Sequence, residues 1–235
     1  MIPISDNIFF FTRRNPIIIY CLIGINIALF LWELKLELDG TLGNFINSWG
    51  VVPGQINTAF ANALTGNSAA WIVVLMRLTS LIVGMFLHGS FSQILGNLIF
   101  LWVFGKTIES VLGYGKFLVF YLVSGILTGF VQILAEPSLT VPLIGANGTI
   151  TAILGAYVFK FPKAKIDTIL PILIVFIPVQ LPAYFYLFWW FVQQISYGIG
   201  SLNIPGGVNP ASNGYLAQFA GLFIGAALIK LLQRF

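Results

Sequence analysis

Long apolar runs with almost no charge inside them constrain this chain more than any other feature of its sequence. Only 8% of the 235 residues are charged and 58% are hydrophobic, whereas a soluble domain carries about 25% charged residues. A chain of this kind cannot hide its apolar surface from water, so lipid must surround most of it. A transmembrane β-barrel would alternate apolar and polar residues, but these runs are apolar on every side. The sequence therefore predicts an all-α, polytopic membrane protein.

Six segments have the length or composition of membrane-spanning helices. A spanning helix needs about 20 apolar residues, and the polar stretch from Lys35 to about Ser80 has no such run. We expect that stretch to form a long extracytoplasmic first loop, with its apolar piece AAWIVVLM in the membrane interface. The whole chain, 1–235, is expected to form a single membrane domain. Its helices are expected at roughly 16–34, 85–104, 115–134, 147–161, 167–197 and 213–232.

Lysine and arginine fall almost entirely on one side of this six-helix arrangement. Only Lys35 and Arg77 lie on the other side. The positive-inside rule therefore predicts that both termini are cytoplasmic. The net charge of +4 then reflects membrane orientation and gives no indication of a nucleic-acid partner. The residues on the basic side are Arg13, Arg14, Lys106, Lys116, Lys160, Lys163, Lys165, Lys230 and Arg234.

Polar side chains inside the apolar runs are costly in lipid, so they indicate function or helix packing. Gln93 and Asn97 are four residues apart and share one helix face. Asn147 opens the fourth segment and Gln218 lies near the start of the sixth. Small-residue stripes allow two helices to approach closely, and this predicts that the fourth and sixth helices pack together and bring Asn147 near Gln218. The stripes consist of Gly148, Ala152 and Gly155 on one helix and Gly221 and Gly225 on the other.

The order and spacing of these motifs resemble the rhomboid family of six-helix intramembrane serine proteases. The resemblance runs from about residue 77 to 229 and, more loosely, from Met1. In the second segment the family frame is occupied by His88, Gln93, Asn97, Phe104, Gly105 and Glu109. The family's Gly-x-Ser-Gly turn corresponds to Gly145, Ala146, Asn147 and Gly148, and Gly155, Ala156 and Tyr157 follow. The family's last-helix motif corresponds to Ala217, Gln218, Gly221 and Gly225.

The departures from the family pattern fall on its chemistry. The resemblance aligns the nucleophilic serine with Asn147, the general-base histidine with Gln218, and the second histidine of the second helix with Gln93. Asn97 remains as a possible oxyanion donor. An amide neither attacks a carbonyl nor titrates near neutral pH. In a serine–histidine pair, the serine attacks the carbonyl and the histidine accepts the proton of the serine. No catalytic residue is therefore expected.

Substitute residues for the missing pair are weak candidates. We expect His88, the only histidine, to be a hydrogen-bonded structural residue. Thr149 and Thr151 are expected to bond back to carbonyls of the preceding helical turn. Asn147 is expected to cap the fourth helix and to bond to Gln218. Glu109 is expected to tether a loop or a helix end.

The first functional hypothesis is a rhomboid-like pseudoprotease that binds transmembrane segments of client proteins without cleaving them. The alternative is an active intramembrane serine endopeptidase that uses non-standard residues. A small-solute transporter is weaker still, because we see no inverted repeat and no chain of buried ionisable residues. The bilayer and the client segments are the expected partners. We expect no cofactor, metal or nucleic acid, and the sequence leaves the oligomeric state open.

Overall fold

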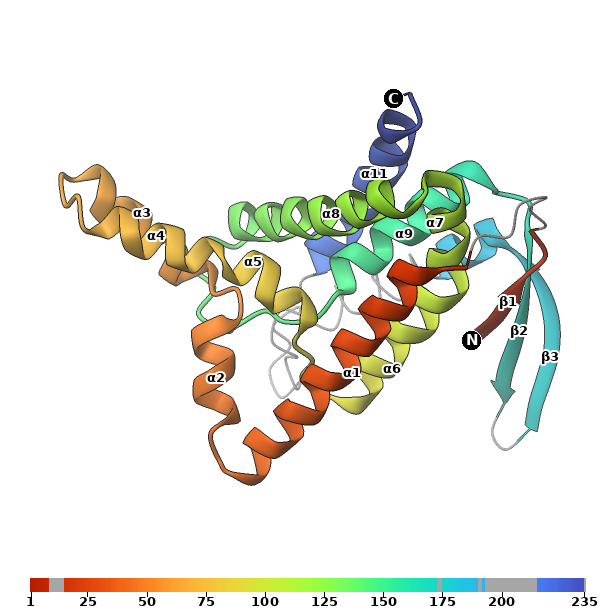
Figure 1. The fold of residues 1–235 in the computed structure, drawn as a ribbon, viewed down its shortest axis with the longest axis horizontal. Helices are drawn as coiled ribbons and strands as arrows, with labels where there is room; N and C mark the ends of the chain where they lie inside the picture. The colour runs from red at the N-terminus through yellow and green to blue at the C-terminus, as the bar shows by residue number, and fades with distance from the viewer. Residues whose placement is uncertain (9–14, 173–174, 190–191, 193–214, 235) are drawn as a thin grey trace.

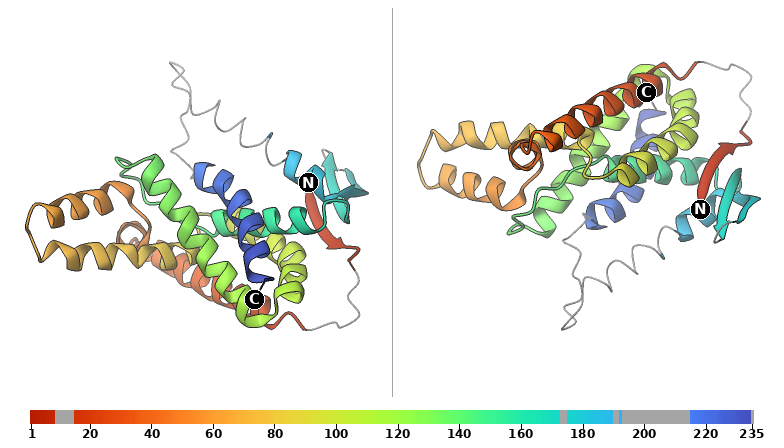
Figure 2. Two further views of the ribbon diagram at one scale, coloured as in Figure 1. Left: turned by 90° about the horizontal axis from the view of Figure 1, so that it is seen from above. Right: turned by 90° about the horizontal axis from the view of Figure 1, so that it is seen from below.

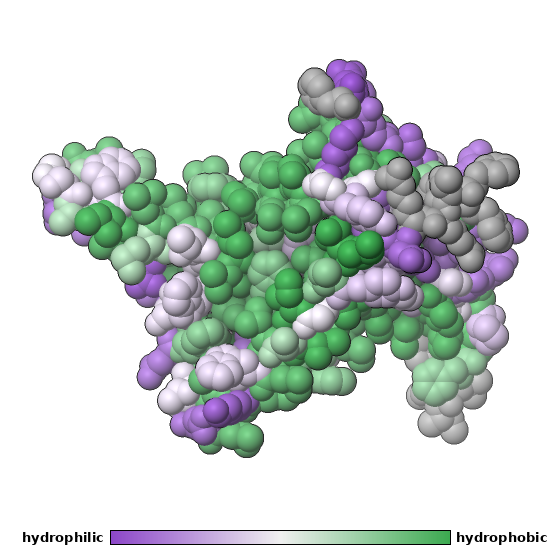
Figure 3. All heavy atoms as spheres, viewed as in Figure 1, coloured by the Kyte–Doolittle hydropathy of each residue, from purple (hydrophilic) through white to green (hydrophobic). Residues whose placement is uncertain are grey.

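The computed structural model describes residues 1–8, 15–172, 175–189, 192 and 215–234. A bundle of helices forms the body of the molecule, and a small sheet stands beside it near the N-terminus (Figure 1). Three helical segments are long and apolar enough to cross a membrane: Ile17–Leu38, Phe91–Leu112 and Tyr114–Ala135. Apolar side chains cover most of the face shown in Figure 3, which is the surface expected of a protein that contacts lipid.

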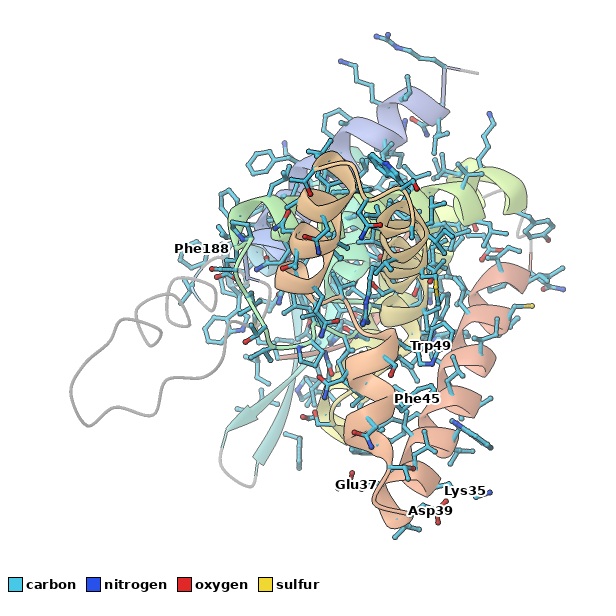
Figure 4. All side chains as sticks on the ribbon, turned by 90° about the vertical axis from the view of Figure 1, so that its left-hand side faces the viewer. Lys35, Glu37, Asp39, Phe45, Trp49 and Phe188 are labelled. Carbon is cyan, nitrogen blue, oxygen red and sulfur yellow. The ribbon has the colours of Figure 1, made fainter. Side chains whose placement is uncertain are left out.

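The first long helix is α1 (Ile17–Leu38), and short helices follow it up to the second apolar segment. They are α2 (Leu42–Trp49), α3 (Pro53–Leu64), α4 (Ala70–Leu78), α5 (Ser80–Val83) and the 3₁₀ turn η1 (Gly84–Phe86). In Figure 1, α3 and α4 form a hairpin that projects from the left of the bundle. Figure 4 shows Lys35, Glu37 and Asp39 around the end of α1, with Phe45 and Trp49 on α2 above them.

The second apolar segment begins later than the sequence predicts. Leu87 is extended, and Ser90 caps helix α6 (Phe91–Phe100) by accepting from the Gln93 N–H at 3.2 Å. The helix continues through the π-helical turn η2 (Leu101–Gly105) into α7 (Lys106–Leu112). The predicted range 85–104 is therefore corrected to 91–112, because a serine side chain satisfies the first free N–H groups only from residue 90 onward.

Three further helices complete the bundle: α8 (Tyr114–Ala135), α9 (Asn147–Lys160) and α11 (Tyr215–Leu232). The centre of the bundle is aromatic. Phe104, Phe117, Phe120, Tyr121 and Tyr157 are all fully buried. The Phe104 and Tyr157 rings meet edge to face, with their centroids 5.0 Å apart. Figure 2 shows α9 and α11 crossing in the middle of the molecule, where α8 also passes.

The predicted fifth helix, 167–197, is wrong over its first half. Lys165–Ile172 is strand β2 and Val175–Pro182 is strand β3, and β2 also pairs antiparallel with β1 (Ile2–Asp6). Residues 183–189 are helical, and most of the predicted helix beyond them lies outside the described residues. A short apolar run rich in β-branched residues cannot be assigned to helix or strand by periodicity alone. Pro178 and Pro182 lie on β3, which is an edge strand of the sheet. Proline is tolerated there because no further strand needs its missing N–H as a donor.

Candidate functional site

The turn before α9 brings Asn147 to the start of that helix. Gly145 has a φ of 105°, in the left-handed region that glycine tolerates best. Its N–H donates to the Gly84 carbonyl at 2.8 Å, and Leu143 exchanges two backbone hydrogen bonds with Val51. The turn is thus held by the first loop on one side and by η1 on the other. Asn147 is half-buried.

Asn147 does not cap the helix as the sequence suggested. Ala146 is the N-cap residue, and no side chain makes a capping hydrogen bond there. Asn147 is instead the first residue within the helix, one position too late for its side chain to cap the N–H groups that follow. The predicted hydrogen bond from Asn147 to Gln218 stays a prediction.

Gln93 joins the two loops that lead into α6 and α9. Its side-chain oxygen accepts from the Gly89 N–H at 2.8 Å, and its side-chain nitrogen donates to the Ile144 carbonyl at 3.0 Å. Both ends of the amide are therefore used. A Cβ built on Gly145 would collide with the Gln93 amide and would lie 3.6 Å from Asn147 Nδ2. Glycine at this position therefore leaves room for the Gln93 amide beside the turn.

Asn97 contacts the only imidazole of the chain. Asn97 Nδ2 lies 3.1 Å from His88 Nε2, and His88 Nδ1 lies 3.2 Å from the Phe86 carbonyl oxygen. Because a carbonyl only accepts, the neutral ring carries its proton on Nδ1, and Nε2 accepts from Asn97. One N–H of Asn97 is thus directed at His88 and not toward a developing oxyanion.

His88 is a buried structural residue in this arrangement. Its side chain is 2% exposed, and its backbone N–H donates to the Glu33 carboxylate of α1 at 3.0 Å. Sequence reasoning missed Glu33. Its signal was present, since an acidic residue inside an apolar helix indicates a specific partner.

Gln218 lies in the first turn of α11, and a second amide fixes that turn. Gln132 of α8 accepts from the Ala217 N–H at 3.1 Å and donates to the Glu136 carboxylate at 2.6 Å. The Gln132 side chain is 1% exposed, so this bond lies inside the bundle. The position of Gln218 therefore depends on α8 as well as on α9.

Glycines allow α9 and α11 to touch through their backbones. A Cβ on Gly225 would overlap the Ala152 carbonyl, and a Cβ on Gly155 would overlap the Leu222 backbone. Gly221 faces Thr151 and the Gly148 carbonyl. Gly148 also adjoins α8, because a Cβ there would collide with Thr128. The contact thus joins three helices, and Gly148 lies between α8 and α11.

The two threonines of α9 differ from each other. Thr151 Oγ1 donates to the Gly148 carbonyl at 2.8 Å, which confirms the expected bond to the preceding turn. Thr149 contradicts it, since among the described residues its buried hydroxyl has no hydrogen-bond partner. Thr149 Oγ1 lies beside Gly125 of α8, and the residue is 1% exposed, so its hydroxyl lies inside the bundle.

Carboxylates hold the opposite end of the long helices. Glu109 accepts from the Ile18 and Ile19 N–H groups, each at 3.0 Å, and so tethers the start of α1 as the sequence suggested. Asp6 of β1, which sequence reasoning missed, accepts from the Thr107 hydroxyl at 2.5 Å and the Tyr157 hydroxyl at 2.9 Å. The Glu109 carboxylate suits its role, because its two oxygens accept from free N–H groups at the start of α1.

The helical piece 183–189 lies against this same end. The Tyr186 hydroxyl is 2.5 Å from Thr168 Oγ1 of β2, and the Tyr186 ring meets Phe104 at 5.5 Å between centroids. Phe188 and Trp189 are exposed, as expected for side chains that face lipid. Trp190, paired with Trp189 in the sequence, lies outside the described residues.

The four amides of the site share one hydrogen-bonding chemistry. Gln93, Asn97, Asn147 and Gln218 can donate and accept hydrogen bonds, but none of them supplies a nucleophile or a base near neutral pH. A peptide segment with unpaired backbone groups is the kind of ligand such amides would bind in lipid.

Comparisons of the sequence with known proteins identify its family. The rhomboid domain model matches residues 75–235. Presenilin-associated rhomboid-like protein A, a mitochondrial protein of Danio rerio, is 32% identical over 40% of this chain and 25% of its own length. Rhomboid protein 1 of Saccharomyces cerevisiae mitochondria is 26% identical over 67% of this chain and 40% of its own length.

A putative rhomboid protease of Bacillus subtilis is 34% identical over 34% of this chain and 39% of its own length. The matched part of the chain thus spans well under half the length of each of these relatives. The family model, in contrast, covers more than half of the chain, and its match includes all of α6, α8, α9 and α11. The chain belongs to the rhomboid family.

Proposed function

We propose that this chain is a rhomboid-fold pseudoprotease that binds transmembrane segments of membrane-protein clients without cutting them. The observation that carries the proposal is the chemistry of the site. Asn147 and Gln218 occupy the positions that the family pattern gives to serine and histidine. The one imidazole of the chain, His88, is buried and bonded to Asn97. Loss of a single member of a serine–histidine pair already removes several orders of magnitude of rate.

The binding mode follows from what amides supply. In the bilayer, a helix-breaking segment exposes backbone N–H and carbonyl groups that have no water to bond. Asn147 and Gln218 lie at the start of α9 and α11, and each amide offers both a donor and an acceptor. Client segments that unwind locally would therefore be preferred over uniform helices.

The proposed membrane topology has six spans and both termini on the cytoplasmic side. Three spans have the length and composition required, and Leu216–Leu232 is a shorter apolar helix. The correction of the fifth segment leaves the charge distribution intact, because Lys160, Lys163 and Lys165 all precede the helical piece 183–189. Cysteine accessibility at Lys163 and at Asp39 in intact cells would test it. Labelling of both positions from the same side would contradict the topology.

The first experiment measures cleavage of a generic rhomboid transmembrane substrate by the purified full chain in liposomes. Asn147→Ser/Gln218→His and the same variant with Gln93→His run beside it, and Asn47→Ser/Gln55→His on the exposed first loop is the matched control. We expect the natural chain and the control to be inactive. Cleavage by the natural chain would overturn the pseudoprotease and favour the alternative, an active endopeptidase with non-standard residues.

A second experiment tests client binding directly. A photo-crosslinking residue at Phe188, which is exposed on the helical piece 183–189 (Figure 4), is compared with one at Leu38, the exposed end of α1. We expect crosslinks from position 188 to a transmembrane peptide that contains a Gly-Pro break, and far fewer to an unbroken leucine helix. Equal capture of both peptides would contradict the proposed binding mode.

A further inference from the structure

The outer face of the three-stranded sheet carries an apolar strip that no helix of the described structure covers. Residues paired across an antiparallel sheet share one face. The pairing of Ile2 with Ile169 and of Ile169 with Pro178 therefore sets one face, to which Phe176 also belongs. Ile2, Ile4 and Phe176 are 39%, 47% and 63% exposed. Ile4 is the extra residue at the register shift between Pro3 and Ser5, and it is included because it is exposed, not because a pairing sets its face. We call this set, Ile2, Ile4, Ile169, Phe176 and Pro178, the apolar strip.

The two faces of the sheet differ sharply. The opposite face, with Pro3, Ile166 and Thr168, is buried against the bundle. Asp6 on that face bonds to Thr107 and Tyr157. These contacts fix the orientation of the sheet, so the apolar strip must face away from the helices. Figure 1 shows the sheet standing to the right of α6, with its strands running clear of the helices toward their lower ends.

The same outer face becomes polar toward the base of the sheet. Ser5 and Gln180 both donate to the Asp167 carboxylate, at 2.7 Å and 2.9 Å. Lys165, at the start of β2, and Lys163, in the turn before it, are exposed. The face is thus amphipathic along its length, with apolar side chains at one end and charges at the other.

We propose that the apolar strip lies in the headgroup region of the bilayer, on the lysine-rich side of the membrane. Three observations favour lipid over another protein. The sheet is attached to α7 and to the end of α9, so it lies where membrane-spanning helices leave the membrane. Lys163 and Lys165 offer the positive charge that anionic lipids attract. Helix α6, which contacts β1, also exposes apolar side chains, among them Phe91 and Leu95.

The chemistry of the sheet fits the interface and excludes the hydrocarbon core. Open strand edges have unpaired N–H and carbonyl groups, which hydrocarbon cannot satisfy but interfacial water can. An interfacial apolar surface penetrates about 5–10 Å into the headgroup boundary. Phe176 and the isoleucines would reach that depth, while Asp167 and Gln180 stay in water.

The test is depth-dependent fluorescence quenching on the purified full chain in vesicles of phosphatidylcholine and phosphatidylglycerol. Cys21, the only cysteine, is first replaced by serine, and a nitrobenzoxadiazole dye is attached to Phe176→Cys. Gln180→Cys, on the same strand and the same face, is the matched control, and Ile4→Cys is a second test position on another strand. Only labelled variants that keep the thermal transition of the unlabelled chain are compared.

We expect nitroxide lipids labelled high on the acyl chain to quench the dye at 176 and at 4 at least about threefold more than at 180, given the depth of interfacial insertion. Aqueous iodide should show the reverse order. Dyes at 176 and 4 that iodide quenches as strongly as at 180 would overturn the proposal. A dye shielded from both quenchers would indicate contact with a second copy of the chain, and that outcome also overturns it.

Discussion

At the end of the bundle where α6 and α9 begin, amides join neighbouring loops, whereas at the other end carboxylates accept from helix starts and hydroxyls. We call these the amide end, with Gln93, Asn97, Asn147 and Gln218, and the carboxylate end, with Asp6 and Glu109. Glu33 is the exception at the amide end, where it accepts from the His88 N–H. A carboxylate only accepts, while an amide also donates. The amide end therefore joins its loops through donors as well as acceptors, as Gln93 does, and it is where the proposed client binding would take place. The carboxylate end holds elements of the chain together through acceptors alone.

The largest effect is expected at the carboxylate end from Glu109→Ala. The change leaves the Ile18 and Ile19 N–H groups without an acceptor, and hydrogen bonds to a charged group contribute about 1.5–3 kcal/mol each. We expect the free energy of unfolding in mild detergent to fall by about 3 kcal/mol or more. Glu37→Ala, at the exposed end of α1, is the control. Equal effects of the two variants would show that the tether does not stabilise the fold.

Between the two ends, Gly225→Ala tests the contact of α9 with α11. The new Cβ would overlap the Ala152 carbonyl, and overpacking costs about 1–3 kcal/mol. Gly24→Ala on α1 is the matched control, because a Cβ there meets no atom within 4 Å. The thermal midpoint of Gly225→Ala should drop while that of the control stays or rises. A drop of the same size in both variants would contradict the backbone contact.

Asp6→Ala should have a smaller effect than Glu109→Ala, because its donors are two hydroxyls and not backbone N–H groups. We expect a loss of about 1–3 kcal/mol, together with faster proteolysis of the N-terminal strand, since β1 loses its attachment to α7 and α9. Asp39→Ala provides the comparison at an exposed acid of the first loop. Unchanged protease resistance of residues 2–6 would contradict the role of Asp6 in docking the sheet.

Gln93→Leu tests the amide end with a smaller expected change. The Gly89 N–H and the Ile144 carbonyl lose their partner, and neutral hydrogen bonds contribute about 1 kcal/mol each. The crosslink yield to a Gly-Pro peptide should fall more than stability does, because the loop before α9 positions Asn147. If Gln93→Leu destabilises the chain as much as Glu109→Ala, the proposed division between the two ends is wrong.

The smallest effect is expected in the pH dependence of stability, through Asp167 in strand β2 of the sheet. Hydrogen bonds from Ser5 and Gln180 lower the pKa of Asp167. A carboxyl whose pKa is lower in the folded state stabilises the fold above its unfolded pKa, and that contribution is lost as pH falls through the folded value. Unfolding of the natural chain should therefore become slightly easier in acid, and Asp167→Asn should remove that part of the pH dependence. An unchanged pH profile in Asp167→Asn would show that this group makes no contribution.

Most residues of the carboxylate end and the amide end could be identified from the sequence. Their hydrogen-bond partners could not. Gln93 and Asn97 were found because amides in an apolar helix are unusual, and Glu109 because it ends a spanning segment. Glu33 carried the same signal and was missed. Asp6 carried none, since an acid five residues from the start of a chain is ordinary until Thr107 and Tyr157 are placed beside it.

The sequence by itself determined that this is a helical membrane protein of the rhomboid family with glycine-lined helices, and that amide residues stand at positions 147 and 218. Those conclusions depend on composition, apolar length and motif spacing, which are local properties of the chain. Only the tertiary structure decided that Lys165–Ile172 and Val175–Pro182 are strands and not helix, because β1 supplies a partner for β2 from the other end of the chain. It also decided that Ala146 and not Asn147 precedes the helix, and that Asn97 binds His88. A hydrogen bond between residues far apart in the sequence depends on how the whole chain is arranged, and a local sequence pattern does not predict that arrangement.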